Sequence, residues 1–336
     1  MPPVGARPAL TLADVLEARS AIAPYLLRTP LHAYPGLGEL VGADVRVKHE
    51  NHLPTGAFKV RGGINLVSHL EAAERARGLV TASTGNHGQS LGYAGRLFGA
   101  PVVVCVPVGA NPAKLASMRA LGVELVEHGR DFDEAREHCE ALAETRGYRY
   151  VHSGNEPWLI AGVGTHTLEA LEQEPRLDAI LVPIGGGSGA AGACIVAKSV
   201  APACEVIGVQ AEAAPAAFKS WQARSVVEDR MGTAAEGLAT RVGFELRSRS
   251  SGSTSTTSSS SARTSSGQRH DSWSSTPETS SRARPRRRSL RRCGSETGSA
   301  VAASRCSAPA ETSRWTSSGR CSHGTPIPHS SITGLA

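Results

Sequence analysis

The chain has 336 residues, enough for two domains and a sizeable core, and its formal net charge is +6. That charge is unevenly placed, because the segment from Arg247 onward carries 14 arginines, no lysine and 4 acidic residues, which leaves −4 for residues 1–246. The body is therefore mildly acidic, like an ordinary enzyme, and lacks the basic surface that binds nucleic acid.

The cysteines and the N-terminus bear on the compartment. The body holds Cys105, Cys139, Cys194 and Cys204 without CxxC spacing, and Cys105 and Cys194 lie in apolar runs. Buried free thiols in a reducing compartment are the interpretation we favour. The N-terminus lacks the apolar core of a signal peptide, and no stretch is long enough to span a membrane. We predict a cytoplasmic protein without a membrane partner.

The first elements lead into a short glycine-rich turn. Thr11 followed by Asp14 predicts an N-cap that opens a helix from Leu12 to about Leu26. The chain breaks at Pro30, and the alternating run Val45–His49 predicts a strand that leads into the turn.

The stretch Asn51–Gly63, NHLPTGAFKVRGG, places Lys59 behind a Pro-Thr-Gly-Ala turn and Phe58, at the entrance of a predicted helix. A lysine held there is partly desolvated and fixed in direction, and under these conditions an amine acts as a Schiff-base nucleophile. Taken alone, the stretch fits a solvated lysine at a helix start equally well.

The rest of the body alternates between strands and helices. We expect strands at 79–82, 102–106, 123–127, 149–152, 179–184 and 206–210, and helices at 59–77, 87–98, 112–121, 132–145, 159–171 and 190–200. This alternation indicates βαβ units, and short apolar runs are typical of strands buried on both faces. The predicted fold class is α/β, with two parallel-sheet domains and a cleft between them.

Two motifs stand at junctions between a strand and a helix. Ser83–Gln89 reads STGNHGQ after the first of these strands, and Gly185–Gly189 reads GGGSG after the fifth. Backbone N–H groups at a helix N-terminus form an anion site, so either loop can bind a phosphate or a carboxylate. A plain helix cap by Ser83 or Thr84, and a glycine turn that serves tight packing, remain the alternatives.

Together with AFKVRGG, these motifs resemble the fold-type II pyridoxal-phosphate enzymes, in the threonine/serine dehydratase (ammonia-lyase) branch that also includes serine racemases. The resemblance covers about Leu10 to Leu246. It implies a tryptophan synthase β-like architecture, in which 54–150 form a small inserted domain and 1–53 with 151–246 form the large cofactor-binding domain, whose C-terminal part is missing. It also implies a homo-oligomer with a small amino-acid substrate.

The same resemblance implies the roles of the cofactor site. Lys59 carries pyridoxal 5'-phosphate, Asn86 bonds its phenolic oxygen, and Phe58 and Gly237 lie against it. Glu236, beside Gly237, replaces a common aspartate. The cofactor phosphate is expected in a cup formed by Gly185, Gly186, Gly187, Ser188 and Gly189.

The resemblance also implies the substrate site and the catalytic residues. Ser83, Thr84, Gly85 and His87 form the loop expected to bind the substrate carboxylate. Lys59, once freed, takes the α-proton. Racemases of the family have a serine as second base where Thr84 stands, and the bulkier, stiffer threonine favours dehydration. We predict no metal site, because neutral Gln210 occupies the region where metal-activated relatives have an acidic ligand.

The implied function is a lyase that converts L-threonine or L-serine to a 2-oxo acid and ammonia. A serine/threonine racemase, a threonine synthase-like enzyme and an inactive remnant are the alternatives.

The tail, 247–336, has no apolar period, and about 30 % of it is serine. Its composition predicts disorder, with RNA or an acidic surface as a conceivable partner. A shifted reading frame is the competing hypothesis. In GC-rich DNA, a stretch that encodes Ser, Thr and Arg in one frame can encode apolar and acidic residues in the neighbouring frame. Leu246–Ser259 and Arg305–Arg320 can be back-translated into an amphipathic segment and a Gly-Gly-Asn turn of the family's C-terminal part.

Overall fold

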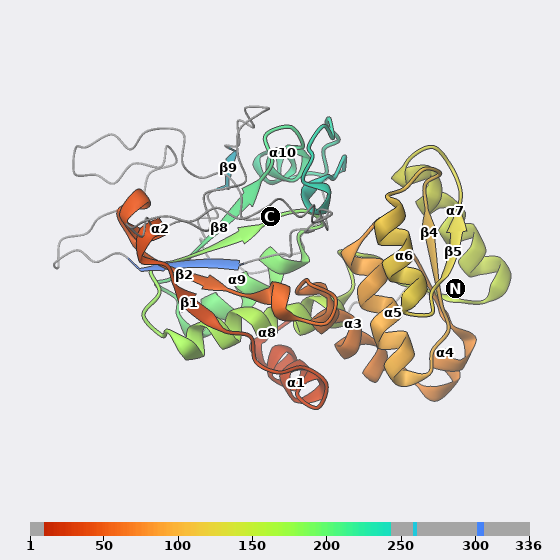
Figure 1. Ribbon diagram of the computed structural model, residues 1–336, viewed down its shortest axis with the longest axis horizontal. Helices are drawn as coiled ribbons and strands as arrows, with labels where there is room; N and C mark the ends of the chain where they lie inside the picture. The colour runs from red at the N-terminus through yellow and green to blue at the C-terminus, as the bar shows by residue number, and fades with distance from the viewer. Residues whose placement is uncertain (1–9, 243–257, 261–300, 306–336) are drawn as a thin grey trace, which may run out of the picture.

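The computed structural model describes residues 10–242, 258–260 and 301–305, which form two lobes (Figure 1). The smaller lobe is built on a four-stranded sheet in the order β5-β4-β3-β6, and all its neighbouring strands are parallel. Its strands are β3 (Leu79–Ala82), β4 (Val102–Val106), β5 (Glu124–Glu127) and β6 (Arg149–Tyr150).

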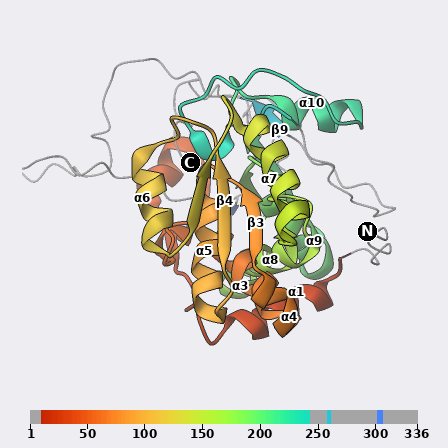
Figure 2. The same cartoon turned by 90° about the vertical axis from the view of Figure 1, so that its right-hand side faces the viewer.

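Helices cover both faces of this small sheet. Figure 2 shows α5 (Asn86–Phe98) and α6 (Pro112–Ala120) on one side of the strands and α7 (Phe132–Arg146) on the other. All five residues of β4 are buried. Burial on both faces explains the unbroken apolar run, and the parallel α/β prediction is confirmed for this lobe.

The larger lobe holds a six-stranded sheet in the order β1-β2-β10-β7-β8-β9. Strands β7, β8 and β9 pair in parallel, whereas β1, β2 and β10 make antiparallel pairs, so this sheet is mixed. The strands are β1 (Leu31–Ala33), β2 (Asp44–Lys48), β7 (Ala179–Pro183), β8 (Glu205–Gln210), β9 (Ser258–Ser260) and β10 (Val301–Arg305).

Two of these strands come from the tail, for which the sequence predicted no elements. Strand β10 lies between β2 and β7, and β9 adds to the edge at β8. At these residues the structure has strands where the sequence predicted none, because strand edges offer backbone N–H and C=O groups that an extended segment of almost any composition can pair. The remainder of 247–336 lies outside the described residues.

The other elements surround the large sheet or join the lobes: α1 (Leu12–Ile22), α2 (Pro35–Val41), η1 (Glu50–His52), α3 (Lys59–Ser68), α4 (Ala72–Arg77), α8 (Pro157–Gln173), α9 (Ser188–Val200), α10 (Ala216–Ala223) and η2 (Glu236–Leu238). Helix α3 packs against both α5 and α8, so it lies between the two lobes (Figure 1). A side chain on Gly62 would meet the Leu159 carbonyl oxygen at 2.8 Å, so glycine permits this close helix crossing. Helix α3 thus carries its first residue, Lys59, to the junction of the lobes.

Several element boundaries differ from the sequence prediction. Thr11 caps α1 as expected, since its N–H donates to Asp14 Oδ2 at 2.7 Å, but the helix ends at Ile22. Pro24 has no N–H with which to continue it. The helix predicted over 59–77 is two helices, because Glu71 and Glu74 form a capping box that starts α4. The short helices α2 and α10 were not predicted.

The predicted buried thiols are partly confirmed. All four cysteines within the described part of the chain are free, and Cys105 is fully buried, while Cys194 is half-buried. None of the helices in the described ranges is long and apolar enough to cross a lipid bilayer.

Candidate active site

The amine of Lys59 is held at the N-terminus of α3 by two acceptors from the large lobe. Its Nζ donates to Ser188 Oγ at 2.7 Å and to the Ser153 carbonyl oxygen at 3.0 Å. No carboxylate in the described part of the chain pairs with it. Burial without a counter-charge lowers the pKa of Lys59 to about 8. This environment favours the nucleophile over the solvated lysine.

The GGGSG loop forms a tight cradle at the start of α9. Gly187 is the N-cap with φ +80°, a left-handed conformation that glycine adopts without strain. A Cβ on Gly185 would lie 2.3 Å from the Gly237 carbonyl oxygen, and one on Gly189 would lie 3.2 Å from Phe58 Cζ. The structure thus brings Phe58 and Gly237 to this loop, and it leaves little space for a side chain at Gly185 or Gly189. Backbone N–H groups at the positive end of α9 remain to bind an anion.

The second loop, Ser83–His87, precedes and opens α5. Ser83 Oγ accepts hydrogen bonds from Gly85 N at 3.2 Å and Gly88 N at 2.9 Å, so its hydroxyl caps the helix. The cap is the simpler alternative that the sequence had left open. This cap is compatible with the predicted anion site, because the N-terminus of α5 keeps its partial positive charge.

The ring of His87 points into the small lobe. Thr81 Oγ1 donates its hydrogen to the Val151 carbonyl oxygen at 2.7 Å, so His87 Nε2, 3.0 Å away, must donate to Thr81. His87 Nδ1 is then unprotonated, and it is buried without a partner in the described part of the chain. Burial first, and the charge of Lys59 second, lower the pKa of His87 to about 3. The neutral ring is no carboxylate-binding cation, so His87 can contribute to that loop only through its backbone.

Two other predicted residues have side chains without a hydrogen-bond partner in the described part of the chain. Thr84 and Asn86 are half-buried at the mouth of α5, and neither side chain forms a hydrogen bond within the described residues. The roles predicted for them, catalysis and a bond to the cofactor oxygen, stay predictions.

An ion pair beside this loop was missed by sequence reasoning. Lys114, in the first turn of α6, pairs with Glu236, and its Nζ lies 3.6 Å from where a Cβ on Gly85 would stand. The pair joins the small lobe to the segment that carries Gly237. Nothing in its local sequence distinguishes Lys114 from a surface lysine.

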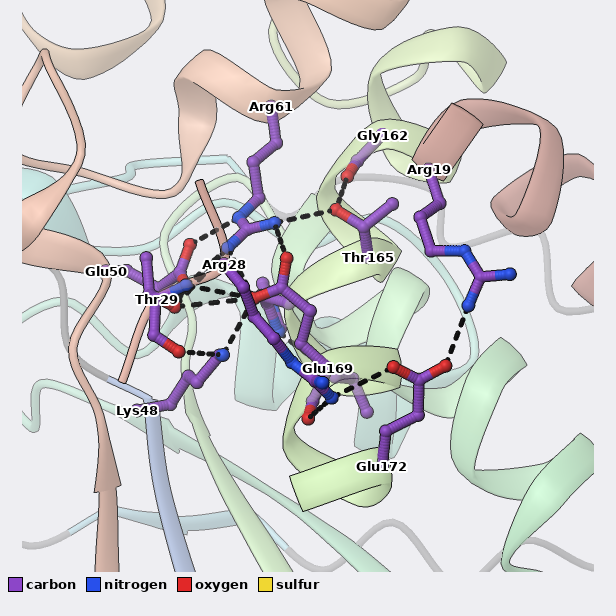
Figure 3. Close-up of polar contacts among 12 residues, drawn as sticks. Arg19, Arg28, Thr29, Lys48, Glu50, Arg61, Gly162, Thr165, Glu169 and Glu172 are labelled. Atoms are coloured by element: carbon purple, nitrogen blue, oxygen red, sulfur yellow. Dashed lines mark hydrogen bonds and ion pairs between the residues drawn. The ribbon is translucent and has the colours of Figure 1, made fainter. Parts of the chain in front are cut away.

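A buried ionic network lies two residues beyond Lys59 (Figure 3). Arg61 Nε donates to Glu50 Oε2 at 2.7 Å, and Arg61 Nη1 donates to Glu169 Oε1 at 2.7 Å. Lys48 Nζ lies 2.7 Å from the other oxygen of Glu169. Two cations thus balance two carboxylates, and Arg61 is only 1 % exposed.

The network joins four elements, namely β2, η1, α3 and α8. Burial alone lowers the pKa of Lys48 and would raise that of Glu169, but hydrogen bonds from Arg61 hold the pKa of Glu169 below its usual value. Arg61 stands in the AFKVRGG motif, yet its partners come from distant segments. Only the fold reveals that it fixes the helix carrying Lys59.

At the end of β8, Gln210 is a structural residue. Its Oε1 accepts from the Phe218 backbone N–H at 3.0 Å and so supports the start of α10. Within the described residues, no group of three or more His, Cys, Asp or Glu side chains is placed to hold a metal ion.

Comparisons with known proteins agree with this geometry. The model of the pyridoxal-phosphate dependent enzyme family matches residues 22–263. The chain is 37 % identical over 233 residues to L-threonine ammonia-lyase of Thermotoga maritima, covering 69 % of this chain and 58 % of that protein. It is 38 % identical over 229 residues to β-hydroxyaspartate dehydratase of Paracoccus denitrificans, covering 68 % and 73 % of the two chains.

Solved structures give the same result. Processed threonine deaminase isoform 2 from Solanum lycopersicum matches with TM-score 0.66 and 30 % identity, over 69 % of this chain and 67 % of that one. Maize serine racemase matches with TM-score 0.67 and 28 % identity, over 71 % and 73 %. The family match, the lysine at the lobe junction and the glycine cradle agree, and the chain belongs to the pyridoxal-phosphate dependent enzymes.

Proposed function

We propose that this protein is an ammonia-lyase that uses pyridoxal 5'-phosphate to convert L-threonine or L-serine to a 2-oxo acid and ammonia. The observation that carries the proposal is the amine of Lys59, held 2.7 Å from Ser188 at the mouth of the glycine cradle. An aldehyde bearing a phosphate fits this pair of features, because the buried amine can attack the aldehyde while the cradle binds the phosphate. Similarity to L-threonine ammonia-lyase, of which the chain spans 58 %, supports the substrate class.

In this mechanism the bound cofactor supplies an electron sink for the substrate's α-carbon. Lys59 attaches the cofactor and, once freed, accepts the α-proton at Nζ. A pKa of about 8 suits this role, since a base works best when its pKa lies near the working pH. The partly buried position of Lys59 limits access of water to the amine.

The loops orient the reactants in this proposal. Gly185 to Gly189 bind the cofactor phosphate through backbone N–H groups, and Gly237 closes over Gly185. The positive end of α5, at Gly85 and Asn86, attracts the substrate carboxylate, and Asn86 is assigned to bond the cofactor's phenolic oxygen. Thr84 is assigned to the substrate site on its place in this loop.

We also place the enzyme in the cytoplasm, in a reducing environment, because its described cysteines are all free thiols. We expect a homo-oligomer, which size-exclusion chromatography with light scattering will test.

Product assays test the proposed activity. The full chain, loaded with cofactor, is expected to form 2-oxobutanoate from L-threonine or pyruvate from L-serine, and to show the visible absorbance of a lysine-bound cofactor. Lys59→Ala should lose both signals. Lys198→Ala, at an exposed position on α9, is the matched control and should keep both. A folded wild-type chain with neither signal would defeat the proposal for this chain and leave the inactive remnant.

Racemisation is the second candidate, because maize serine racemase matches over 71 % of the chain. Chiral analysis of the serine left in the assay separates the two. Accumulation of D-serine without 2-oxo acid would favour the racemase.

A further inference from the structure

The contact between Lys59 and Ser188 joins the first residues of two helices. Lys59 begins α3 and Ser188 begins α9, and Nζ donates to Oγ at 2.7 Å. Ser188 is only 1 % exposed, so bulk water has little access to its hydroxyl. The sequence had placed Ser188 in the phosphate cup without any link to the lysine.

A serine hydroxyl can accept and donate at the same time. Its lone pairs accept hydrogen bonds, and its single hydrogen donates one. Because Lys59 donates to Ser188, the hydroxyl hydrogen of Ser188 stays free to point to an anion at the positive end of α9. Glycine or alanine at this position would offer the anion a backbone N–H and would offer the lysine nothing.

We propose that Ser188 is a positioning residue for Lys59, whose hydroxyl holds the lysine amine at the phosphate-binding end of α9 and stabilises its protonated form. The inference rests on the proposed function for its purpose, since it assumes that Lys59 attaches the cofactor. The bond itself belongs to the free protein and can be measured without cofactor.

The surroundings of Lys59 leave few groups other than this hydroxyl to stabilise its ammonium form. The titratable groups that face the amine from the packed elements are His87 on α5 and His152 after β6, and burial lowers the pKa of both rings. Both are neutral near pH 7, and neither compensates an ammonium. The described acceptors for that ammonium are then the Ser153 carbonyl, which any residue supplies, and the Ser188 hydroxyl, which only this side chain supplies.

The test is the pH profile with which Lys59 reacts with acetic anhydride in the cofactor-free full-length protein, followed by peptide mass spectrometry. Loss of a hydrogen bond to the ammonium lowers its pKa. We expect Ser188→Ala to shift the labelling midpoint to lower pH, with an acid dissociation constant about fivefold larger, equal to a hydrogen bond of about 1 kcal/mol. Ser188→Thr, which keeps a hydroxyl, should restore the midpoint.

Matched controls separate this effect from a structural one. Ser199→Ala removes a hydroxyl from the exposed end of the same helix, where it bonds the Ile195 carbonyl oxygen, and should leave the Lys59 midpoint unchanged. Circular dichroism establishes that each variant is folded. Identical labelling midpoints in wild type and Ser188→Ala would overturn the proposal. A midpoint shift in Ser188→Gly but not in Ser188→Ala would also overturn it, because the shift would then come from the added backbone freedom of glycine. The labelling experiment needs neither cofactor nor turnover. A failed lyase assay would therefore not change what the labelling midpoints say about Ser188.

Discussion

A single amine sets the pH range in which this site can work. The pKa of Lys59 is about 8 in the folded protein because of burial, against 10.5 for an ordinary lysine. Only the neutral amine attacks an aldehyde, so its supply rises with pH until it saturates above the folded pKa. The nucleophile and the proton acceptor are the same neutral amine, so both roles of Lys59 gain as the pH rises toward 8.

We expect the rate of cofactor attachment to increase about fivefold from pH 7 to pH 8, because the neutral fraction of an amine with a pKa near 8 grows from about a tenth to about a half. Stopped-flow absorbance after mixing protein and pyridoxal phosphate measures it. A profile that keeps rising beyond pH 10 would show instead that Lys59 titrates as a solvated lysine.

A second residue-scale prediction concerns the cradle. Gly185→Ala places a methyl group 2.3 Å from the Gly237 carbonyl oxygen, so the loop must move, at a cost of about 1–3 kcal/mol. We expect weaker binding of the cofactor by about tenfold or more. Gly36→Ala is the control, because a Cβ there meets nothing within 4 Å. Equal affinity in the two variants, measured by fluorescence titration, would remove Gly185 from the phosphate site.

Residues of the site could be predicted from sequence where they lie in a recognisable motif. They could not be predicted where only a contact in the folded protein brings them to the site. Lys59, Gly185 and Gly237 stand in recognisable stretches, and the structure brings them to one place. The Ser153 carbonyl and Lys114 carry no local signal, because a backbone oxygen belongs to every residue and a lysine on a helix is usually solvated. His87 was assigned to the loop at the start of α5, but the position of its ring depends on Thr81 of β3 and on Val151, the residue after β6.

At the scale of elements, the ionic network explains why α3 holds its place between two lobes. Arg61 bonds Glu50 of η1 and Glu169 of α8, so the first turn of α3 is tied from both sides. Buried ion pairs add little net stability when both partners are present, but the loss of one partner leaves a buried charge uncompensated. The network thus specifies position more than it stabilises the fold.

We expect Arg61→Met to lower the free energy of unfolding by about 3–5 kcal/mol, because two carboxylates lose their partner in the interior. Arg19→Met, which breaks a pair with Glu172 whose side chains are 46 % and 39 % exposed, should lower it by less than about 1 kcal/mol. Urea titration compares the two. Similar losses would mean that the interior of the network is hydrated.

The order of elements followed from sequence because buried parallel strands are continuous apolar runs. Strands β3 and β4 were predicted with the bounds that the structure has. The antiparallel pairing of β1 with β2 was not predicted, because strand pairing depends on contacts between segments that are separate in the sequence. The split between α3 and α4 has a local cause, because the Glu71 N–H donates to the Glu74 side chain and so starts a new helix.

At the scale of the whole molecule, two polar links connect the lobes away from α3. Lys114 of the small lobe pairs with Glu236 of the large lobe, and Arg241 pairs with Asp133 of α7. Both carboxylates and both cations are partly exposed, so these pairs weaken with salt. The lobes are expected to separate more easily at high ionic strength, whereas the buried contacts of α3 persist.

The gene offers a test of the tail. If the residues after Leu246 are translated from a shifted frame, resequencing should find one inserted or deleted base near the codons for Glu245 to Arg247. The corrected frame should encode an apolar segment and a Gly-Gly-Asn turn. A neighbouring frame filled with stop codons would contradict this and support a tail selected for its own composition.

The position of β10 has a consequence for the order of assembly. Residues 301–305 pair with both β2 and β7, so within the described sheet the β1–β2 pair joins β7 through a strand made more than 250 residues later. On the ribosome, the small lobe, whose strands span 79–150, can form while that place is still vacant. Contacts across so long a chain are slow to form, so closure of the large sheet is the late step of folding. Until then the edges of β2 and β7 offer unpaired backbone groups, and we expect the unfinished sheet to be open to pairing with another chain.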